Sequence, residues 1–162
     1  MMPAMAEVLL MAVIVGVHVL GGGVWIGAMV FSVFVLHPRA EQFFQGGAQL
    51  EDFIFTVVHG ARWKVVAGIS AIVASGGALA WLGWSAGGPL WRALVLVKLG
   101  LLGISLGLFI HVSWQLWPRR LFAAPAELPA IRRQFWWVGA VMIACNAINL
   151  GLGISAALVR GP

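Results

Sequence analysis

Four long apolar stretches separated by short polar links set the hydrophobic pattern of the chain. They cover about residues 8–36, 53–84, 90–117 and 135–159. A helix needs about 20 apolar residues to cross a bilayer, so each stretch is long enough to span the membrane. The links leave no room for a separate soluble domain. The pattern therefore predicts an all-α, polytopic membrane protein with one domain over residues 1–162, folded as an antiparallel bundle of four transmembrane helices.

The composition agrees with the lipid bilayer as the main solvent. The 162 residues are 62% hydrophobic and 9% charged, whereas a soluble domain carries about 25% charged residues. The net charge of +5 is therefore not a sign of nucleic-acid binding. Cations concentrate beside the first and third links, and the positive-inside rule then puts these links in the cytoplasm and both termini outside. These cations are Arg39, Arg62, Lys64, Arg119, Arg120, Arg132 and Arg133, against Arg92 and Arg160 on the other side.

Histidines inside or beside the spans are the main candidates for chemistry. An ionisable group at membrane depth is costly, so by default it faces other helices rather than lipid. His18 shares a helix face with Gly22, and His111 shares one with Gly107, while a glycine directly follows His59. An imidazole nitrogen can bind haem iron, and a missing side chain leaves room for a flat ring. The pattern favours haem b as the cofactor, although glycines also serve helix packing in membranes.

Depth along the spans sorts the candidate ligands. His59 and His111 fall at comparable depth on antiparallel spans, which makes them the expected pair of ligands for one haem. His18 lies about 15 Å from the level of His111, too far to bind the same iron. His37 leaves the membrane on the same side as His59 and is the alternative to it. A histidine near a helix end is also a common interfacial residue.

A copper site is the competing interpretation. Met11, His18 and Met29 share one face of the first span. Cu(I) prefers soft sulfur ligands and accepts imidazole, so these residues, with the histidines above, are candidate metal ligands. Methionine is also an ordinary filler of hydrophobic cores. The spans contain no Met-x-x-Met or Cys-x-x-Cys pair that would strengthen the copper interpretation.

Lys98 is a cation inside the third span with no acidic residue in any span to pair with. Its expected partners are a neutral group such as Asn149, a haem propionate or a bound anion. The alternative is that its long side chain reaches the membrane surface. No nucleophile–base arrangement or phosphate-binding loop is present, and carboxylate pairs are absent from the spans. These absences argue against a proton-driven pump.

The segment from Val17 to Ala40 resembles the first helix of copper-resistance protein D (CopD)-like membrane proteins. The shared signature is a histidine followed by Trp-x-Gly, here His18, Trp25 and Gly27. The resemblance covers nearly the whole chain through short motifs at Trp63, Ser75-Gly76, Lys98-Leu99-Gly100, His111 and Asn149-Leu150-Gly151. It implies a location in the bacterial inner membrane and a role in copper handling.

A weaker similarity, carried by the first-helix histidine with Trp91 and Lys98, points to the haem-binding membrane protoporphyrinogen oxidase (HemJ) family. Together the two resemblances imply a haem-binding four-helix core around His18, His59 and His111. The expected function is electron transfer across the membrane or to quinone, with a redox partner protein, as a homo-oligomer or a subunit of a larger complex. Copper transport, a porphyrinogen-oxidising enzyme and a non-catalytic accessory subunit are the alternatives.

Overall fold

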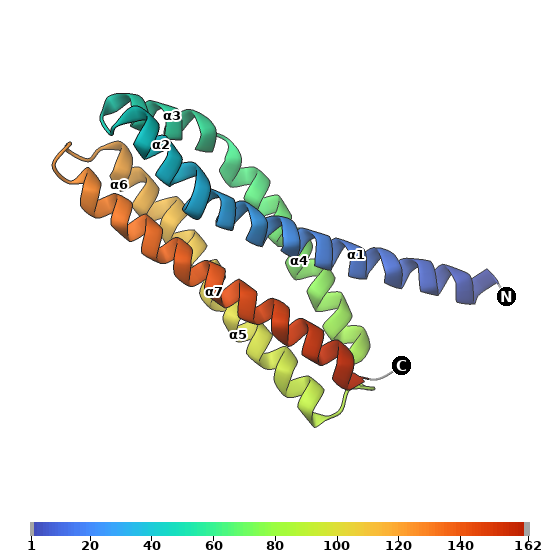
Figure 1. Ribbon diagram of the computed structural model, residues 1–162. Helices are drawn as coiled ribbons and strands as arrows, with labels where there is room; N and C mark the ends of the chain where they lie inside the picture. The colour runs from blue at the N-terminus through green and yellow to red at the C-terminus, as the bar shows by residue number, and fades with distance from the viewer. Residues whose placement is uncertain (1, 161–162) are drawn as a thin grey trace.

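The described part of the chain consists of helices and the short connections between them. The computed structural model describes residues 2–160, with no strand among them. The helices are α1 (Met2–Phe31), α2 (His37–Phe44), α3 (Ala48–Val58), α4 (Ala61–Gly83), α5 (Pro89–His111), α6 (Trp117–Leu121) and α7 (Leu128–Arg160). Figure 1 shows α2, α3 and α6 gathered at one end, which we call the α3 end. Residues 84–88 join α4 to α5 at the opposite, hairpin end.

Four helical stretches are long and apolar enough to cross a membrane. They are Met5–Phe44, Ala61–Gly83, Pro89–Leu121 and Leu128–Val159. The prediction of an all-α bundle with four spans is confirmed. The chain is therefore a multi-pass membrane protein, and most of its side chains face outwards because lipid rather than water surrounds the spans.

The expected start of the second span at residue 53 is wrong. The helix breaks at His59 and Gly60, and Gly60 has a φ of +75°, a backbone conformation that favours glycine. Residues 53–58 belong to the separate helix α3, and the span begins at Ala61. The polar link expected over residues 38–52 is largely helical as well, because α2 and α3 occupy most of it. The fourth span begins at Leu128 rather than at residue 135.

The first and third spans continue past the prolines that were expected to end them. Five-residue π-helical segments, η1 (Ser32–Leu36) and η2 (Val112–Leu116), lie just before Pro38 and Pro118. Proline lacks an N–H and its ring crowds the preceding turn. A π-helical turn is wider and pairs residues five apart, so it accommodates the ring and lets the helix resume.

The two halves of the chain repeat one pattern of elements. We call α1–α4 the first unit and α5–α7 the second unit. In the register that places Pro38 on Pro118, η1 coincides with η2, and the first residue of α2 falls on that of α6. Arg39 then falls on Arg119. The helices that come after the link in each unit also correspond. When Gly76 is aligned with Gly153, α3 and α4 together match α7. The main difference is that α7 is unbroken.

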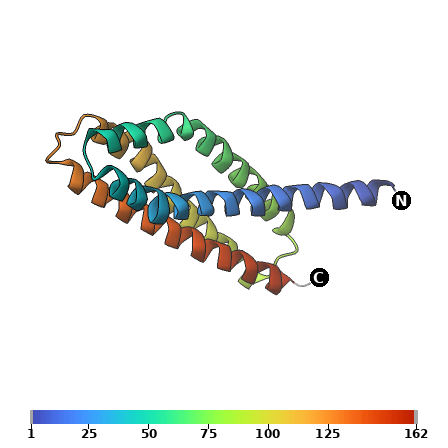
Figure 2. The same ribbon diagram turned by 45° about the horizontal axis from the view of Figure 1, so that its top comes forward.

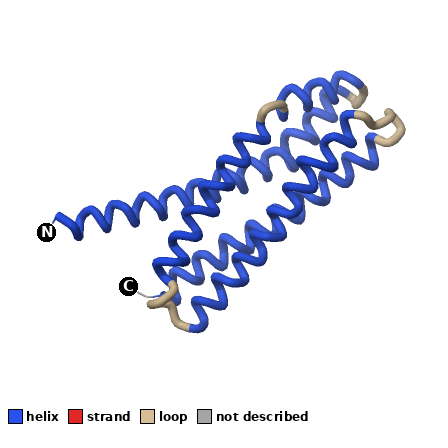
Figure 3. The backbone as a smooth tube through the Cα atoms, turned by 180° about the vertical axis from the view of Figure 1, so that it is seen from behind, coloured by secondary structure: helices blue, strands red, loops and turns tan. Residues whose placement is uncertain are grey.

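Packing follows these units. The most extensive contacts join α1 to α4 and α5 to α7, as Figures 1 and 2 show. The units meet mainly towards the α3 end, whereas the N-terminal part of α1 leaves the bundle at the hairpin end (Figure 3). Between the units, Val33 of η1 packs so closely on Gly139 that a Cβ there would lie 2.6 Å from its Cγ2. At the corresponding place on the other side, Arg62 of α4 donates a hydrogen bond to the carbonyl of Ser113.

A cluster of charged side chains joins the units at the α3 end. Glu51 of α3 accepts hydrogen bonds from Arg120 at 2.7 and 3.2 Å and from Arg132 at 3.1 and 2.7 Å. Arg120 is only 4% exposed and also lies over the ring of Phe135. Arg132 reaches Glu41 at 3.4 Å. Because Glu51 belongs to the first unit and both arginines to the second, this cluster holds the two units together.

We expect Glu51→Gln to lower the free energy of unfolding by about 3 kcal/mol, because it leaves a buried guanidinium without its counter-charge. Reversible unfolding in detergent, followed by tryptophan fluorescence, measures the change. The matched control is Asp52→Asn, which alters a neighbouring exposed carboxylate of α3. An equal effect of the two substitutions would contradict the role given to Glu51.

The same cluster predicts a loss of stability in acid. Burial raises the pKa of Glu51, but hydrogen bonds and charges from Arg120 and Arg132 outweigh it and hold that pKa below its usual value. A carboxylate whose pKa is lowered by folding stabilises the protein above its ordinary pKa, and this contribution is lost as the pH falls. We therefore expect stability to decline below about pH 4. The decline should be smaller in the Glu51→Gln protein when both are unfolded over a series of pH values.

Candidate functional site

His18 lies in the contact between α1 and α4. Its Nδ1 is 3.0 Å from the carbonyl oxygen of Ile72 and 3.3 Å from the hydroxyl of Ser75. A carbonyl oxygen can only accept, so Nδ1 carries the proton and Nε2 keeps its lone pair. The ring rests on Gly76, where a Cβ would come within 2.6 Å of the His18 Cε1. The glycine therefore makes room for this imidazole.

Lys98 occupies the same place in the second unit. Its Nζ donates to the carbonyl of Asn149 at 2.8 Å, and the Asn149 side chain donates back to the carbonyl of Lys98 at 3.1 Å. A Cβ at Gly153 would lie 2.9 Å from Nζ. When the two units are aligned at Pro38 and Pro118, His18 corresponds to Lys98. When they are aligned at Gly76 and Gly153, Ile72 corresponds to Asn149. Each unit thus joins its two long helices through one nitrogen, one carbonyl and one glycine.

His37 is held by its own helix. Its Nδ1 donates to the carbonyl of Ser32 at 2.8 Å and also lies 3.3 Å from the Ser32 hydroxyl. The backbone N–H of His37 bonds to the same carbonyl, which closes the π-helical turn. The Nε2 is again left with its lone pair. His37 therefore resembles His18 in its protonation, but lies near the α3 end of the bundle.

His59 and His111 flank one contact between the units. Arg62 bonds to the carbonyl of Ser113, and its guanidinium lies 5.0 Å from the ring centroid of Trp114. His59 lies three residues before Arg62, across the break between α3 and α4, and His111 lies two residues before Ser113. The long side chain of Arg62 therefore links the beginning of α4 to η2 near the two histidines. We call this region the α4–η2 seam.

The two seam histidines differ in how they are held. The Nδ1 of His111 lies 2.8 Å from the Oε1 of Gln115, one turn along, which leaves Nε2 as the acceptor. His59 ends α3 and is exposed, with its ring 5.2 Å from that of Phe55. A Cβ at Gly107, one turn before His111, would meet nothing within 4 Å. No side chain therefore covers the position where a Cβ of Gly107 would lie.

The remaining predicted residues do not join one cluster. Gly22 also has open space where a Cβ would stand. Met29 packs with Trp25 and Ile69 in the core between α1 and α4. Met11 lies further along α1, towards its N-terminus. Among the described residues, no group of three or more histidine, cysteine, aspartate or glutamate side chains is arranged to hold a metal ion.

Two residues of the seam were not identified from the sequence. Gln115 and Ser113 lie in the π-helical segment before Pro118. In a π-helix the carbonyl of Ser113 would pair with the N–H of the residue five positions later, which is the proline and has none. The signal available in the sequence was that Arg62 lies close to His59 and Pro118 lies close to His111. The sequence analysis placed Arg62 only among the cations beside the first link, and its bond to Ser113 was not anticipated.

Comparison with known proteins gives no further guide to the site. No protein-family model, curated protein or solved structure matches the chain. The geometry of the described residues therefore carries the functional argument.

We expect Gly76→Ala to destabilise the protein by about 1–3 kcal/mol relative to Gly77→Ala, because only the first substitution drives a methyl group into His18. At Gly77 a Cβ would meet nothing within 4 Å, which makes it a matched control on the same helix. Thermal unfolding in detergent measures the difference. Adding His18→Ala to Gly76→Ala should remove the clash. If Gly76→Ala and Gly77→Ala are equally stable, the close packing of His18 on α4 is refuted.

Proposed function

We propose that the chain is a membrane-integral b-type haem protein that transfers electrons, with His111 and His59 of the α4–η2 seam as the haem ligands. The observation that carries the proposal is the contact of Arg62 with Ser113 and Trp114, which links the two histidine-bearing segments. The same pair was expected from the depth of these residues along the spans.

The hydrogen bonding of His111 fits a metal ligand. A histidine that binds metal usually donates its other ring N–H to a carboxylate, a carbonyl or water, which fixes the tautomer and the ring orientation. Gln115 provides such an acceptor at 2.8 Å from Nδ1. His59 is exposed at the end of α3, and its ring contacts that of Phe55. Gly60 follows it at the break between α3 and α4.

The surroundings suit a porphyrin. The open surface at Gly107 leaves space for a planar ring beside His111. Arg62 and Lys64 begin α4 next to the seam and offer cations to propionate groups. The ring of Trp114 lies under the Arg62 guanidinium in the same region.

Four residues of the seam would then each have one role. His111 and His59 would bind the iron through nitrogen, Gln115 would orient the His111 ring, and Arg62 would fix the start of α4. Bound haem supplies one-electron redox chemistry. The hydrocarbon around the spans keeps water away and lowers the local dielectric constant, which tunes the reduction potential. No acidic residue lies within 90–117, so proton transfer is not assigned to the third span.

The partner in electron transfer is proposed to be a quinone in the bilayer or a redox protein, with the chain working as a homo-oligomer or a subunit in the inner membrane. The CopD-like resemblance keeps copper handling as the alternative function. In that case His18 and His37 would be the ligands of interest, since each has an Nδ1 already bonded to a carbonyl and a free Nε2.

The purified protein should show a Soret band, and reduction should give the sharp visible bands of haem b with two histidine ligands. We expect His111→Ala and His59→Ala to abolish the sharp bands, and Gln115→Leu to weaken haem binding about tenfold. His37→Ala, a histidine of similar burial with a self-contained hydrogen bond, is the matched control and should keep the spectrum.

Metal analysis of the same samples separates the alternatives. No Soret band, even after haemin is added, would refute the haem proposal. Bound copper that is lost in the His18→Ala protein would favour the copper alternative instead. A haem spectrum lost in His18→Ala but kept in His111→Ala would show that the ligands were wrongly assigned.

A further inference from the structure

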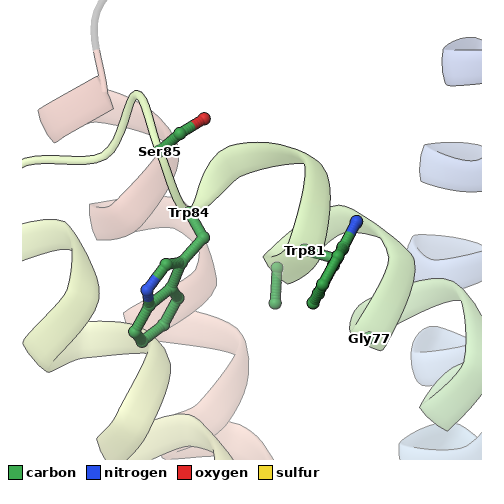
Figure 4. A pocket seen from close by; sticks show the side chains of 5 residues that line it. Gly77, Trp81, Trp84 and Ser85 are labelled. Carbon is green, nitrogen blue, oxygen red and sulfur yellow. The ribbon is translucent and has the colours of Figure 1, made fainter.

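A groove lies on α4 near the hairpin end, away from the α4–η2 seam. It has a volume of about 580 Å³ and is lined by Gly77, Ala80, Trp81, Trp84 and Ser85. Figure 4 shows the Trp81 and Trp84 rings on two sides of this space. Trp81 is 83% exposed, and Ala80 also packs against the core cluster formed by α5 and α7. The lining is apolar except for Ser85 at its rim.

The internal repeat explains why this side of the bundle is open. On the side where α1 meets α7, Gly139 allows Val33 to approach the backbone closely. The residue that corresponds to Gly139 in the first unit is Arg62, and the residue that corresponds to Val33 is Ser113. A long guanidinium side chain thus separates α4 from η2 where the other side has no side chain at all. The two units therefore pack asymmetrically and leave α4 less covered.

A cation stands at the rim of the groove. Arg92, in the first turn of α5, donates from Nε to the carbonyl of Trp84 at 3.1 Å. Its guanidinium carbon lies 5.7 Å from the centroid of the Trp84 ring. Within residues 2–160, no carboxylate forms an ion pair with Arg92. Tryptophans and arginines gather where hydrocarbon meets the lipid headgroups, so we expect this rim to lie at the level of the phosphates.

We propose that this groove is a binding site for an anionic phospholipid, with its phosphate on Arg92 and one acyl chain along Gly77, Trp81 and Trp84. The apolar lining matches a hydrocarbon chain, and the unpaired cation matches a headgroup with net negative charge. A quinone fits less well, because it is neutral and brings no negative charge to Arg92. The site is independent of the proposed haem.

Native mass spectrometry of the full chain tests the site. Delipidated protein in detergent is mixed with equal amounts of phosphatidylglycerol and phosphatidylethanolamine, and the retained lipids are counted. We expect a preference for phosphatidylglycerol that falls about fivefold in Arg92→Gln. Gly77→Leu should reduce retention of both lipids, because its side chain would enter the groove and a Cβ there meets no other residue.

Arg39→Gln is the matched control, since Arg39 is an exposed cation at the opposite end that bonds only weakly to Gln42 at 3.4 Å. It should leave the lipid preference unchanged. Circular dichroism verifies that each variant keeps its helices. An unchanged preference in Arg92→Gln, or undiminished retention in Gly77→Leu, would overturn the proposal. So would a co-purified quinone that Gly77→Leu displaces in place of lipid. Haem spectra of the same variants should be unaffected, which separates this test from that of the haem.

Discussion

Backbone hydrogen bonding in hydrocarbon is the constraint on which this structure depends. Water cannot pair with polar groups inside the bilayer, so each polar side chain within a span must find an acceptor or donor in the protein. Four nitrogen-bearing side chains meet this demand in the same way, by donating to a backbone carbonyl of another helix. They are His18 to Ile72, Lys98 to Asn149, Asn149 to Lys98 and Arg62 to Ser113. The first three join helices within a unit, and the fourth joins the two units.

The repeated unit gives these contacts their arrangement. In both units a long helix widens into a π-helical turn, passes a proline and returns through a second long helix. The units differ at two places, and both differences affect how the units pack on each other. The second helix is broken at His59 and Gly60 only in the first unit, and Arg62 replaces the counterpart of Gly139. The break lets α3 present Glu51 to Arg120 and Arg132, while Arg62 keeps α4 at a distance from η2.

The sequence was sufficient for the number and class of the spans, because apolar length alone determines what can cross a membrane. It also gave Asn149 as one of several possible partners of Lys98, since no acid was present in the spans to take that role, and the structure shows that contact. The ends of the spans could not be predicted from prolines, because a π-helical turn absorbs a proline within a helix. The role of Arg62 was missed for a related reason. Its acceptor, the carbonyl of Ser113, lies in the π-helical segment before Pro118, far from Arg62 in the chain.

The equivalence of His18 and Lys98 separates two roles that a buried nitrogen can have. The single amine nitrogen of Lys98 donates to the carbonyl of Asn149, and a protonated amine has no lone pair for a metal. His18 makes the corresponding contact through Nδ1 and still has Nε2 as an acceptor. The same is true of His37 and His111, whose Nδ1 atoms are also hydrogen-bonded. A membrane helix can therefore use an imidazole both to satisfy a neighbouring carbonyl and to bind iron or copper, whereas a lysine in that place serves the packing alone. This difference is the physical reason for proposing the histidines as the cofactor ligands. The α4–η2 seam contains two histidines, whereas the contact of His18 with α4 contains one.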